Sequence, residues 1–335
     1  MNDKAKNLLG VYTSIGDKVL SHYEIRERIG EGGLAQVYKA WDTRLERWVA
    51  IKSLQPWAMG HTGLQRRLIR EAQLASALSH PNIVTIHEVA EENGVGFIVM
   101  EYVRGKTLDA LIPRRGFSIE QAVRYALQVS GALHAAQEAD ILHGDLKPPN
   151  IMVAADGRLK VLDFGLAKAV AGSRKSDDTR PWERFGTKAY MAPERLRNWR
   201  RGPTLRSEIF SFGLILHQMV SGQHAFKTDS QAQPDAIVRE SPNPLPPETP
   251  AFLARIIRRC LEKNPKKRFQ SMRDLHYALE KCDVESAGRL RGRKASVPMT
   301  KNGRAQQTSR SARADMPDVR AFLAQADYQI GRAHV

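Results

Sequence analysis

HGDLKPPN, residues 143–150, is the stretch around which the rest of this chain is organised. Together with the turn that begins at Asp163, it places the oxygen-bearing side chains of Asp145, Asn150 and Asp163 close in sequence to the cation of Lys147. Hard cations such as Mg²⁺ take oxygen ligands, and a phosphoryl group in transfer needs positive charge around it. The stretch therefore indicates a site that handles a divalent cation and a phosphoryl group.

Length and charge limit the classes of protein to which this chain can belong. The 335 residues are enough for two modest domains or one large bilobed domain with a tail, and 42% of them are hydrophobic, which suffices to build cores. The net charge of +16 fits acidic or phosphorylated partners, a membrane surface or nucleic acid. We expect no nucleic-acid partner, because no zinc-ligand spacing, RNA-binding aromatic motif or recognition-helix pattern accompanies the charge.

Cysteine usage and hydropathy indicate the compartment. Cys260 and Cys282 are the two cysteines, without a CxxC pair or a histidine cluster, so neither a disulfide framework nor a structural zinc is expected. Residues 1–20 lack the apolar core of a signal peptide, and no apolar run approaches the roughly 20 residues that cross a bilayer. We therefore expect a cytoplasmic chain without a membrane span.

The N-terminal part predicts a small sheet domain over residues 21–103, after a disordered lead-in over residues 1–20. Alternating β-branched and aromatic residues, punctuated by glycine, predict strands over residues 23–29, 36–41, 47–54, 83–90 and 96–102. Leucines recur at helical spacing over residues 64–78, which predicts one amphipathic helix.

Beyond Gly105 the composition becomes helical. The spacing of apolar residues predicts helices over residues 119–137, 205–220, 251–261 and 272–281, with short strands and loops over residues 141–161. Residues 104–281 are thus expected to form a second, mainly helical domain. Periodicity then fades, so residues 282–335 predict a flexible basic tail.

A glycine-rich turn joins the first two predicted strands, and it reads IGEGGLAQV from Ile29 to Val37. Glycine lets backbone amides approach phosphate oxygens without a side chain in the way. Taken alone, the pattern is weak evidence and favours an ordinary hairpin with glycine at positive φ. Ala35 stands where the third glycine of GxGxxG is usual, so we expect a slightly stiffer loop that still binds a nucleotide.

Lys52 ends the apolar strand segment Val49-Ala50-Ile51-Lys52, and burying an unpaired ammonium group is costly. Glu71 on the next predicted helix offers a carboxylate partner, and Lys52 would then be shared between Glu71 and nucleotide phosphates. By itself, Glu71 fits equally well a solvated charge on the helix face among the neighbouring arginines. The combination with Lys52 favours the ion pair.

These motifs, in this order, resemble those of eukaryotic-like (Hanks-type) serine/threonine protein kinases, especially the bacterial branch, over residues 23–281. Further matching motifs are Met100 to Val103 as gatekeeper and hinge, Asp163-Phe164-Gly165, Gly186-Thr187, Tyr190 to Glu194, and Arg268. The resemblance implies an α+β protein, with the bilobed protein-kinase fold: a small five-stranded antiparallel N-lobe with one helix and a mainly helical C-lobe. It also implies ATP with Mg²⁺, or Mn²⁺ in its place, and transfer to serine or threonine hydroxyls of proteins in bacterial signalling.

The resemblance assigns a role to each catalytic residue. Asp145 would orient the substrate hydroxyl and take its proton late; a carboxylate of ordinary pKa is a poor base toward an alcohol, so positioning is its larger contribution. Asp163 and Asn150 would hold the metal, and Lys147 would meet the γ-phosphate. Thr187 would hydrogen-bond toward Asp145 and Lys147. A lysine at position 147 is similar to the arrangement in serine/threonine kinases.

The nucleotide site implied by the resemblance comprises Ile29, Gly30, Glu31, Gly32, Gly33, Val37, Ala50, Lys52, Met100, Glu101, Val103 and Met152. The two methionines of this set are expected to line the adenine slot as apolar filler. Other matching residues are expected to be structural: His143 and Phe164 would pack in the regulatory spine, and Glu194 and Arg268 would form a buried ion pair.

Two positions depart from the family pattern. Gly144 stands where most of the family has an arginine that binds a phosphate on the activation segment. We therefore expect activity without phosphorylation of that segment, although hydroxyl residues within residues 166–190 offer acceptors for self-phosphorylation. Glu208 stands where an aspartate usually caps the catalytic-loop backbone, so its extra methylene must be accommodated.

Two other functions stay open at this point. The His-Gly-Asp triplet also occurs in small-molecule phosphotransferases of the aminoglycoside and choline kinase type, but these lack the substrate-docking segment that residues 190–194 resemble. A pseudokinase that acts as a binding module is the other alternative, and the intact catalytic and metal-binding set speaks against it.

The last residues, Ile330 to Val335, look like the translation of a common sequencing adapter. We expect them to be artefactual and the natural gene to be longer. Many bacterial relatives continue past a basic tail into a membrane span and sensor or into a repeat module, so the natural chain is expected to be membrane-anchored if it extends into such a span. The protein substrates, the upstream signal and the oligomeric state do not follow from the sequence.

Overall fold

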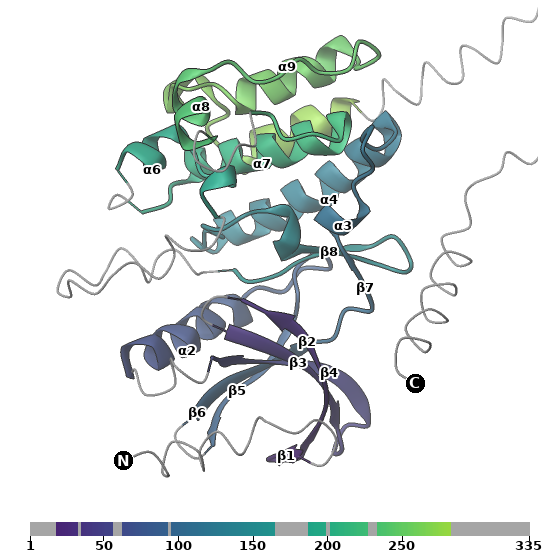
Figure 1. Cartoon of the computed structure of the whole chain (residues 1–335), viewed down its shortest axis with the longest axis vertical. Helices are drawn as coiled ribbons and strands as arrows, with labels where there is room; N and C mark the ends of the chain where they lie inside the picture. The colour runs from purple at the N-terminus through teal and green to yellow at the C-terminus, as the bar shows by residue number, and fades with distance from the viewer. Residues whose placement is uncertain are drawn as a thin grey trace, which may run out of the picture.

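The computed structural model describes residues 18–32, 35–55, 62–92, 95–164, 187–198, 202–226 and 233–282. Figure 1 shows two lobes: purple and blue strands with a helix packed beside them in one, and teal to yellow helices in the other. The predicted bilobed α+β arrangement is confirmed.

The N-terminal lobe is built on one antiparallel sheet in the order β1-β2-β3-β4-β6-β5. Its strands are β1 Lys18–Leu20, β2 Tyr23–Glu31, β3 Ala35–Asp42, β4 Arg47–Leu54, β5 Ile86–Glu92 and β6 Val95–Glu101. The five predicted strands are present, with shifts at their ends. The short β1 pairs with β2, so its residues belong to the sheet and not to the lead-in expected over residues 1–20.

The alternation of side chains along β4 decides where Lys52 lies. Val49 and Ile51 point to one side and join a buried cluster with residues of β2, β3 and β6. Ala50 and Leu54 belong to different clusters on the opposite face. Because successive side chains of a strand alternate, Lys52 lies between Ala50 and Leu54 on that opposite face.

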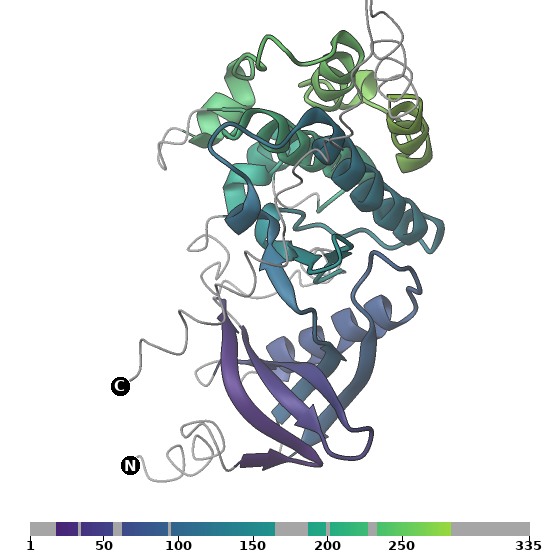
Figure 2. The same cartoon turned by 90° about the vertical axis from the view of Figure 1, so that its right-hand side faces the viewer.

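Helix α2, Thr62–Ser76, covers this face of the sheet and packs against β5 and β6 (Figure 2). Its Leu68 and Ala72 form a buried cluster with Leu54 and Ile98. The helix was expected to continue through residue 78; instead the Leu78 amide donates to the Ala75 carbonyl in a turn.

The C-terminal lobe contains the predicted helices as α4 Ile119–Glu138, α7 Leu205–Ser221, α9 Ala251–Cys260 and a helix over residues 272–282. Helix α7 is buried along most of its length. It begins with a reciprocal capping box between Thr204 and Ser207 and ends at Gly222, where φ is +72°. Short helices that were not predicted are α3 Leu108–Leu111, α6 Pro193–Arg197 and α8 Gln233–Arg239.

A small three-stranded sheet lies between the lobes (Figure 1): β7 Gly105–Thr107, β8 Ile151–Ala154 and β9 Leu159–Val161. The Val84 amide donates to the Val161 carbonyl at 3.0 Å, which ties β9 to the segment leading into the N-terminal sheet. The loop from α4 to β8 is thereby held at the lobe boundary. Within the described ranges, no helix combines the length and the apolar character that a membrane crossing requires.

Candidate active site

The loop between α4 and β8 positions three predicted catalytic side chains. Lys147 Nζ donates to Asp145 Oδ2 at 2.7 Å, and Asn150 Nδ2 donates to the Asp145 carbonyl oxygen at 2.9 Å. A single 3₁₀ turn, Pro148–Asn150, sets this spacing, because proline fixes φ where the turn begins. The Asp145 side chain keeps 19% exposure, so its carboxylate is held by the loop and still reached from solvent.

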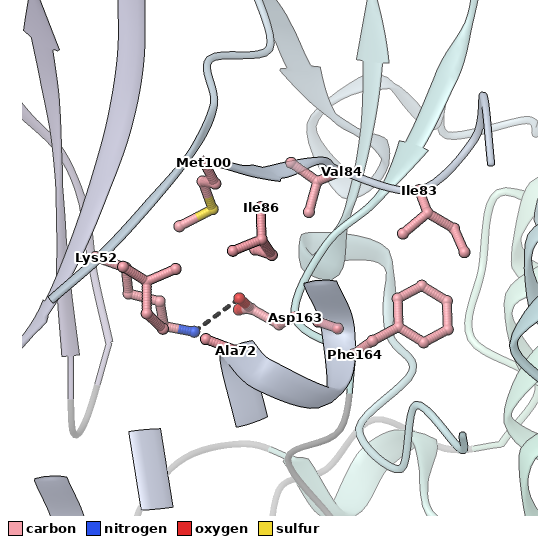
Figure 3. Close-up of a pocket in the computed structure, with 10 residues that line it drawn as sticks. Lys52, Ala72, Ile83, Val84, Ile86, Met100, Asp163 and Phe164 are labelled. Carbon is pink, nitrogen blue, oxygen red and sulfur yellow. Dashed lines mark hydrogen bonds and ion pairs between the residues drawn. The ribbon is translucent and has the colours of Figure 1, made fainter. Parts of the chain in front are cut away.

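A second charged pair joins the two lobes. Lys52 Nζ on β4 donates to Asp163 Oδ1 at 2.7 Å, as Figure 3 shows. Burial, the largest single effect, would raise the pKa of the Asp163 carboxyl, but the charge and hydrogen bond of Lys52, together with His143 and Lys147, hold this pKa below its ordinary value. Asp163 also has φ +58°, in the left-handed region that side chains other than glycine rarely adopt. Such strain is typical of functional positions.

The two charged pairs belong to one site. The Leu162 amide donates to the Asn150 carbonyl oxygen at 2.8 Å, so the segment that carries Asp163 lies beside the catalytic loop. Lys147 is also near enough to help lower the pKa of Asp163.

An apolar cluster lies between the lobes. Its buried members are Ala50, Val84, Met100 and Val103, and Val37, Ile86, Tyr102, Met152, Ala154 and Leu162 pack against them half-buried. Ala50 and Met100 are partners across neighbouring strands, whereas Met152 comes from β8 in the lobe boundary. The predicted adenine-slot residues Val37, Ala50, Met100, Val103 and Met152 are thus brought together. An apolar site with a few polar groups at its edge fits a purine base.

A pocket adjoins this cluster between α2, the sheet and the Asp163-Phe164 turn (Figure 3). Its lining includes Lys52, Ala72, Met100, Asp163 and Phe164. The Lys52–Asp163 pair therefore lies at the wall of a cavity and not within a filled core.

The glycine-rich turn is held by its backbone and by Gln55. Ile29, Gly30 and Glu31 are the last residues of β2. The Gly32 amide donates to the Ala35 carbonyl at 2.8 Å, and Gln55 Nε2 donates to the Gly32 carbonyl at 3.1 Å and to Glu31 Oε1 at 3.3 Å. Gly33 lies outside the described residues.

Glu101, expected in the hinge, uses its side chain to join the lobes. Its Oε2 accepts from Lys160 Nζ on β9 at 2.8 Å and from the Thr85 amide at 3.2 Å. Sequence reasoning did not find Lys160, and no pattern around it signals a partner 59 residues away. Nucleotide binding by Glu101 stays a prediction, which now rests on its backbone.

Two predicted catalytic residues are described in part. Glu71 lies on α2 and Thr187 begins a 3₁₀ turn, Thr187–Tyr190, but the side chains of both lie outside the described residues. Gly165 and residues 166–186 lie wholly outside the described residues. The Lys52–Glu71 pair and the Thr187 hydrogen bond therefore stay predictions.

His143 and Phe164 are packing residues, as predicted. Their ring centroids lie 4.9 Å apart and both side chains are buried. Burial holds the pKa of His143 below its ordinary value, so the ring is neutral. Its Nδ1 accepts a hydrogen bond from the Asp145 amide at 3.3 Å.

Glu208 caps the catalytic loop despite its extra methylene. The Gly144 amide donates to Glu208 Oε1 at 2.7 Å. Gly144 has φ +79°, a left-handed conformation in which the absence of a side chain avoids strain. The longer acid thus occupies the capping position expected for an aspartate.

The predicted ion pair between Glu194 and Arg268 is confirmed. Arg268 Nη1 and Nη2 donate to the two carboxylate oxygens of Glu194 at 2.8 and 2.9 Å, and the arginine side chain is fully buried. Arg268 also donates to the backbone carbonyls of Glu262, Arg206 and Lys263. The pair fixes α6 to the body of the lobe.

The side chains at this site fit a hard divalent cation. Asn150 gives its amide nitrogen to the Asp145 carbonyl, which leaves its side-chain oxygen as the ligand atom, and Asp163 offers an ionised carboxylate. Within the described residues, no three His, Cys, Asp or Glu side chains form a metal cage. A small cation that keeps water and phosphate ligands suits such an open set.

Comparison with known proteins agrees with this geometry. A family model of the protein kinase domain matches residues 23–278. The chain is 38% identical over 268 residues to a probable serine/threonine-protein kinase of Clostridium acetobutylicum, an alignment that covers 78% of this chain and 40% of the relative.

Two further relatives match a similar region. Serine/threonine-protein kinase PrkC of Bacillus subtilis is 34% identical over 283 residues, 82% of this chain and 41% of that protein. Serine/threonine-protein kinase PknA of Mycobacterium tuberculosis is 34% identical over 265 residues, 77% of this chain and 60% of that protein. The chain thus matches less than two thirds of the length of each relative. The match spans both lobes and the site between them, and the chain belongs to the protein kinase domain family.

Proposed function

We propose that the chain is an ATP-dependent serine/threonine protein kinase of bacterial signalling, which transfers the γ-phosphate of ATP to protein hydroxyls. One observation carries the proposal: the Asp145–Lys147 and Lys52–Asp163 pairs meet at one site beside an apolar slot between the lobes. The relatives' names as serine/threonine-protein kinases support the acceptor class.

Each charged residue of the site then has its own role in the transfer. Lys52 binds the α- and β-phosphates, and Lys147 neutralises charge that builds up on the transferred group. Asp145 orients the acceptor hydroxyl and accepts its proton. Mg²⁺, or Mn²⁺ in its place, supplies further charge neutralisation when bound, and Asn150 and Asp163 are the residues that would hold it.

Residues 187–197 form a platform beside the catalytic loop, and this platform supports a polypeptide acceptor over a small molecule. His224 Nε2 donates to the Ala189 carbonyl at 2.8 Å, with its Nδ1 facing the Phe226 amide. Ser211 Oγ donates to the Tyr190 carbonyl at 2.7 Å. Together with the Glu194–Arg268 pair, these bonds hold residues 187–197 in place.

Incubation of the purified chain with Mg²⁺ and γ-labelled ATP tests the proposal, with and without casein. We expect label on serine and threonine of casein or of the chain itself, and none for Asp145→Asn or Lys52→Met. Removal of metal by EDTA should abolish transfer, and Mn²⁺ should restore it in part.

The alternatives predict different results. Transfer to kanamycin or choline without transfer to protein would show a small-molecule phosphotransferase. ATP binding in a thermal-shift assay, with equal and negligible turnover for wild type and Asp145→Asn, would show a binding module.

We also propose self-phosphorylation within residues 166–190 that is not needed for activity, because Gly144 has no side chain with which to bind a phosphate. Replacing Ser173, Ser176 and Thr179 by alanine should then leave casein phosphorylation within about threefold of wild type. A loss of roughly 100-fold would contradict this. Phosphosite mapping of the wild type shows whether these residues carry label.

A further inference from the structure

Arg195 on α6 reaches into the catalytic loop. Its Nη1 donates to the carbonyl oxygen of Gly144 at 2.8 Å. Gly144 directly precedes Asp145, so the guanidinium holds the peptide group that also carries the Asp145 amide. None of the motifs in the sequence marks Arg195.

The same short stretch of backbone is held from other directions. Glu208 on α7 accepts from the Gly144 amide at 2.7 Å, and His143 Nδ1 accepts from the Asp145 amide at 3.3 Å. The Gly144 amide, the Gly144 carbonyl and the Asp145 amide are therefore each hydrogen-bonded to a side chain. Glycine itself offers no side chain to fix this backbone, so the fixing groups come from α6, α7 and the loop.

The charges around Arg195 favour its position. Burial lowers the pKa of the guanidinium, and the nearby carboxylates of Asp145, Glu208 and Glu194 act against this effect. Glu194 is already bound by Arg268 on two hydrogen bonds. Arg195 therefore lies near acidic groups of two other segments, Asp145 in the loop and Glu208 on α7.

The base from which Arg195 extends is rigid. It follows Glu194, which the buried Arg268 ties to the body of the lobe. Because α6 is anchored one residue away, ordering the Arg195 side chain in the loop costs less conformational entropy than it would from a free segment. The hydrogen bond from Arg195 is thus suited to fix the position of the Gly144 carbonyl, in addition to placing a positive charge there.

We propose that Arg195 is a positioning residue for phosphoryl transfer: it holds the Gly144 carbonyl while Glu208 holds the Gly144 amide, and so sets the orientation of Asp145. This role rests on the kinase function proposed above. It also couples the polypeptide platform, which includes α6, to the group that orients the acceptor hydroxyl.

The test compares Arg195→Gln, Arg195→Lys and a matched control, Arg197→Gln, an exposed arginine two residues on along the same helix. Arg195→Gln should lower kcat about 10- to 100-fold, since small misplacements of a catalytic group are costly, and should leave KM for ATP and for the acceptor within about threefold. Arg195→Lys should lose only about threefold in kcat, because an ammonium group still donates to Gly144. Arg197→Gln should match wild type.

Urea unfolding midpoints separate positioning from folding. A folded Arg195→Gln with wild-type kcat would overturn the proposal, and so would a raised KM for the acceptor at unchanged kcat, which indicates docking alone. If Arg195→Gln does not fold, Arg195→Lys decides: a reduced kcat at a wild-type midpoint supports the role, and a wild-type kcat refutes it. An inactive wild type would instead contradict the proposed kinase function.

Discussion

Glu208 is buried in α7, and its ordinary pKa of 4.5 is raised to about 7 because burial disfavours the charged carboxylate. Hydrogen bonds from the amides of Gly144 and His143 and the charge of Arg195 act in the opposite direction and do not cancel burial. Between about pH 4.5 and pH 7, Glu208 keeps its proton in the folded protein but releases it in the unfolded chain. The free energy of unfolding therefore falls as the pH rises from about 4.5 to about 7.

We predict that Glu208→Gln removes this pH dependence. The wild type should lose on the order of 3 kcal/mol through this group between about pH 5 and pH 8, whereas a neutral glutamine of the same shape should lose none of it. Urea unfolding at both pH values measures the difference. Glu262→Gln, an exposed position in the same lobe, should keep the wild-type dependence, and equal pH slopes for wild type and Glu208→Gln would rule out the assignment.

A second prediction concerns Gly144. Its φ of +79° costs an L side chain about 1–2 kcal/mol, so Gly144→Ala should lower both stability and kcat. Gly157 has φ +80° and open space on the side where a side chain would project, so Gly157→Ala should show the stability loss alone. Urea midpoints and kcat for both variants check this. A Gly144→Ala enzyme with full kcat would show that the backbone before Asp145 need not be held.

That Asp145, Lys147 and Asn150 lie together could be predicted from the sequence, because the proposed phosphoryl transfer requires fixed residue types at fixed spacing. Asp145, Lys147 and Asn150 lie within one loop, and their contacts follow from that loop. The partners of long charged side chains could not be predicted. Lys160 and Arg195 reach across the fold to residues far away in sequence, and their flanking residues carry no trace of the contact.

Among the elements, the crossing of α7 and α9 depends on Gly213. A side-chain carbon at this position would lie 2.6 Å from Cys260 Cβ and 3.2 Å from a Leu261 methyl group. The glycine is thus required by close approach of two helices, although it sits inside a helix where its conformational entropy is a cost.

We predict that Gly213→Ala destabilises the protein by about 1–3 kcal/mol through overpacking. Cys260→Ala should not rescue it, because the clash is with Cβ, which alanine keeps. Gly131→Ala in α4 is the matched control: its nearest neighbours lie at 3.6 Å or more, so the better helix propensity of alanine should leave stability unchanged or raised by up to about 1 kcal/mol. Thermal unfolding of the three variants measures the effects, and a neutral Gly213→Ala would show that the helices move apart at little cost.

The long elements followed from periodicity, and the short ones did not. Helices α4, α7 and α9 each bury one face or more over several turns, so their apolar residues recur at helical spacing. Helices α3 and α6 span about one turn and β7 has three residues, which is too short for a repeat to appear. These elements exist because neighbouring segments hold them, as Arg268 holds α6.

Across the whole molecule, the Glu101–Lys160 pair links the hinge end of the N-terminal sheet to β9 beside the catalytic site. We predict that Lys160→Met raises KM for ATP about 3- to 10-fold and changes kcat less than about twofold, because the slot between the lobes is held less firmly. Lys266→Met, at an exposed position of the C-terminal lobe, should leave both constants unchanged. Steady-state kinetics with varied ATP decide, and an unchanged KM for Lys160→Met would show that the pair does not hold the slot.

Arg268 has a consequence for how the molecule folds. Its guanidinium makes five hydrogen bonds, two to Glu194 and three to the carbonyls of Arg206, Glu262 and Lys263. A partly formed C-terminal lobe would bury this cation with donors unmet, which is costly, so stable partial structures that contain it are disfavoured. Closing the 74-residue loop from Glu194 must therefore precede a stable lobe. Amide protons of α6, α7 and α9 should exchange with solvent in a single cooperative opening.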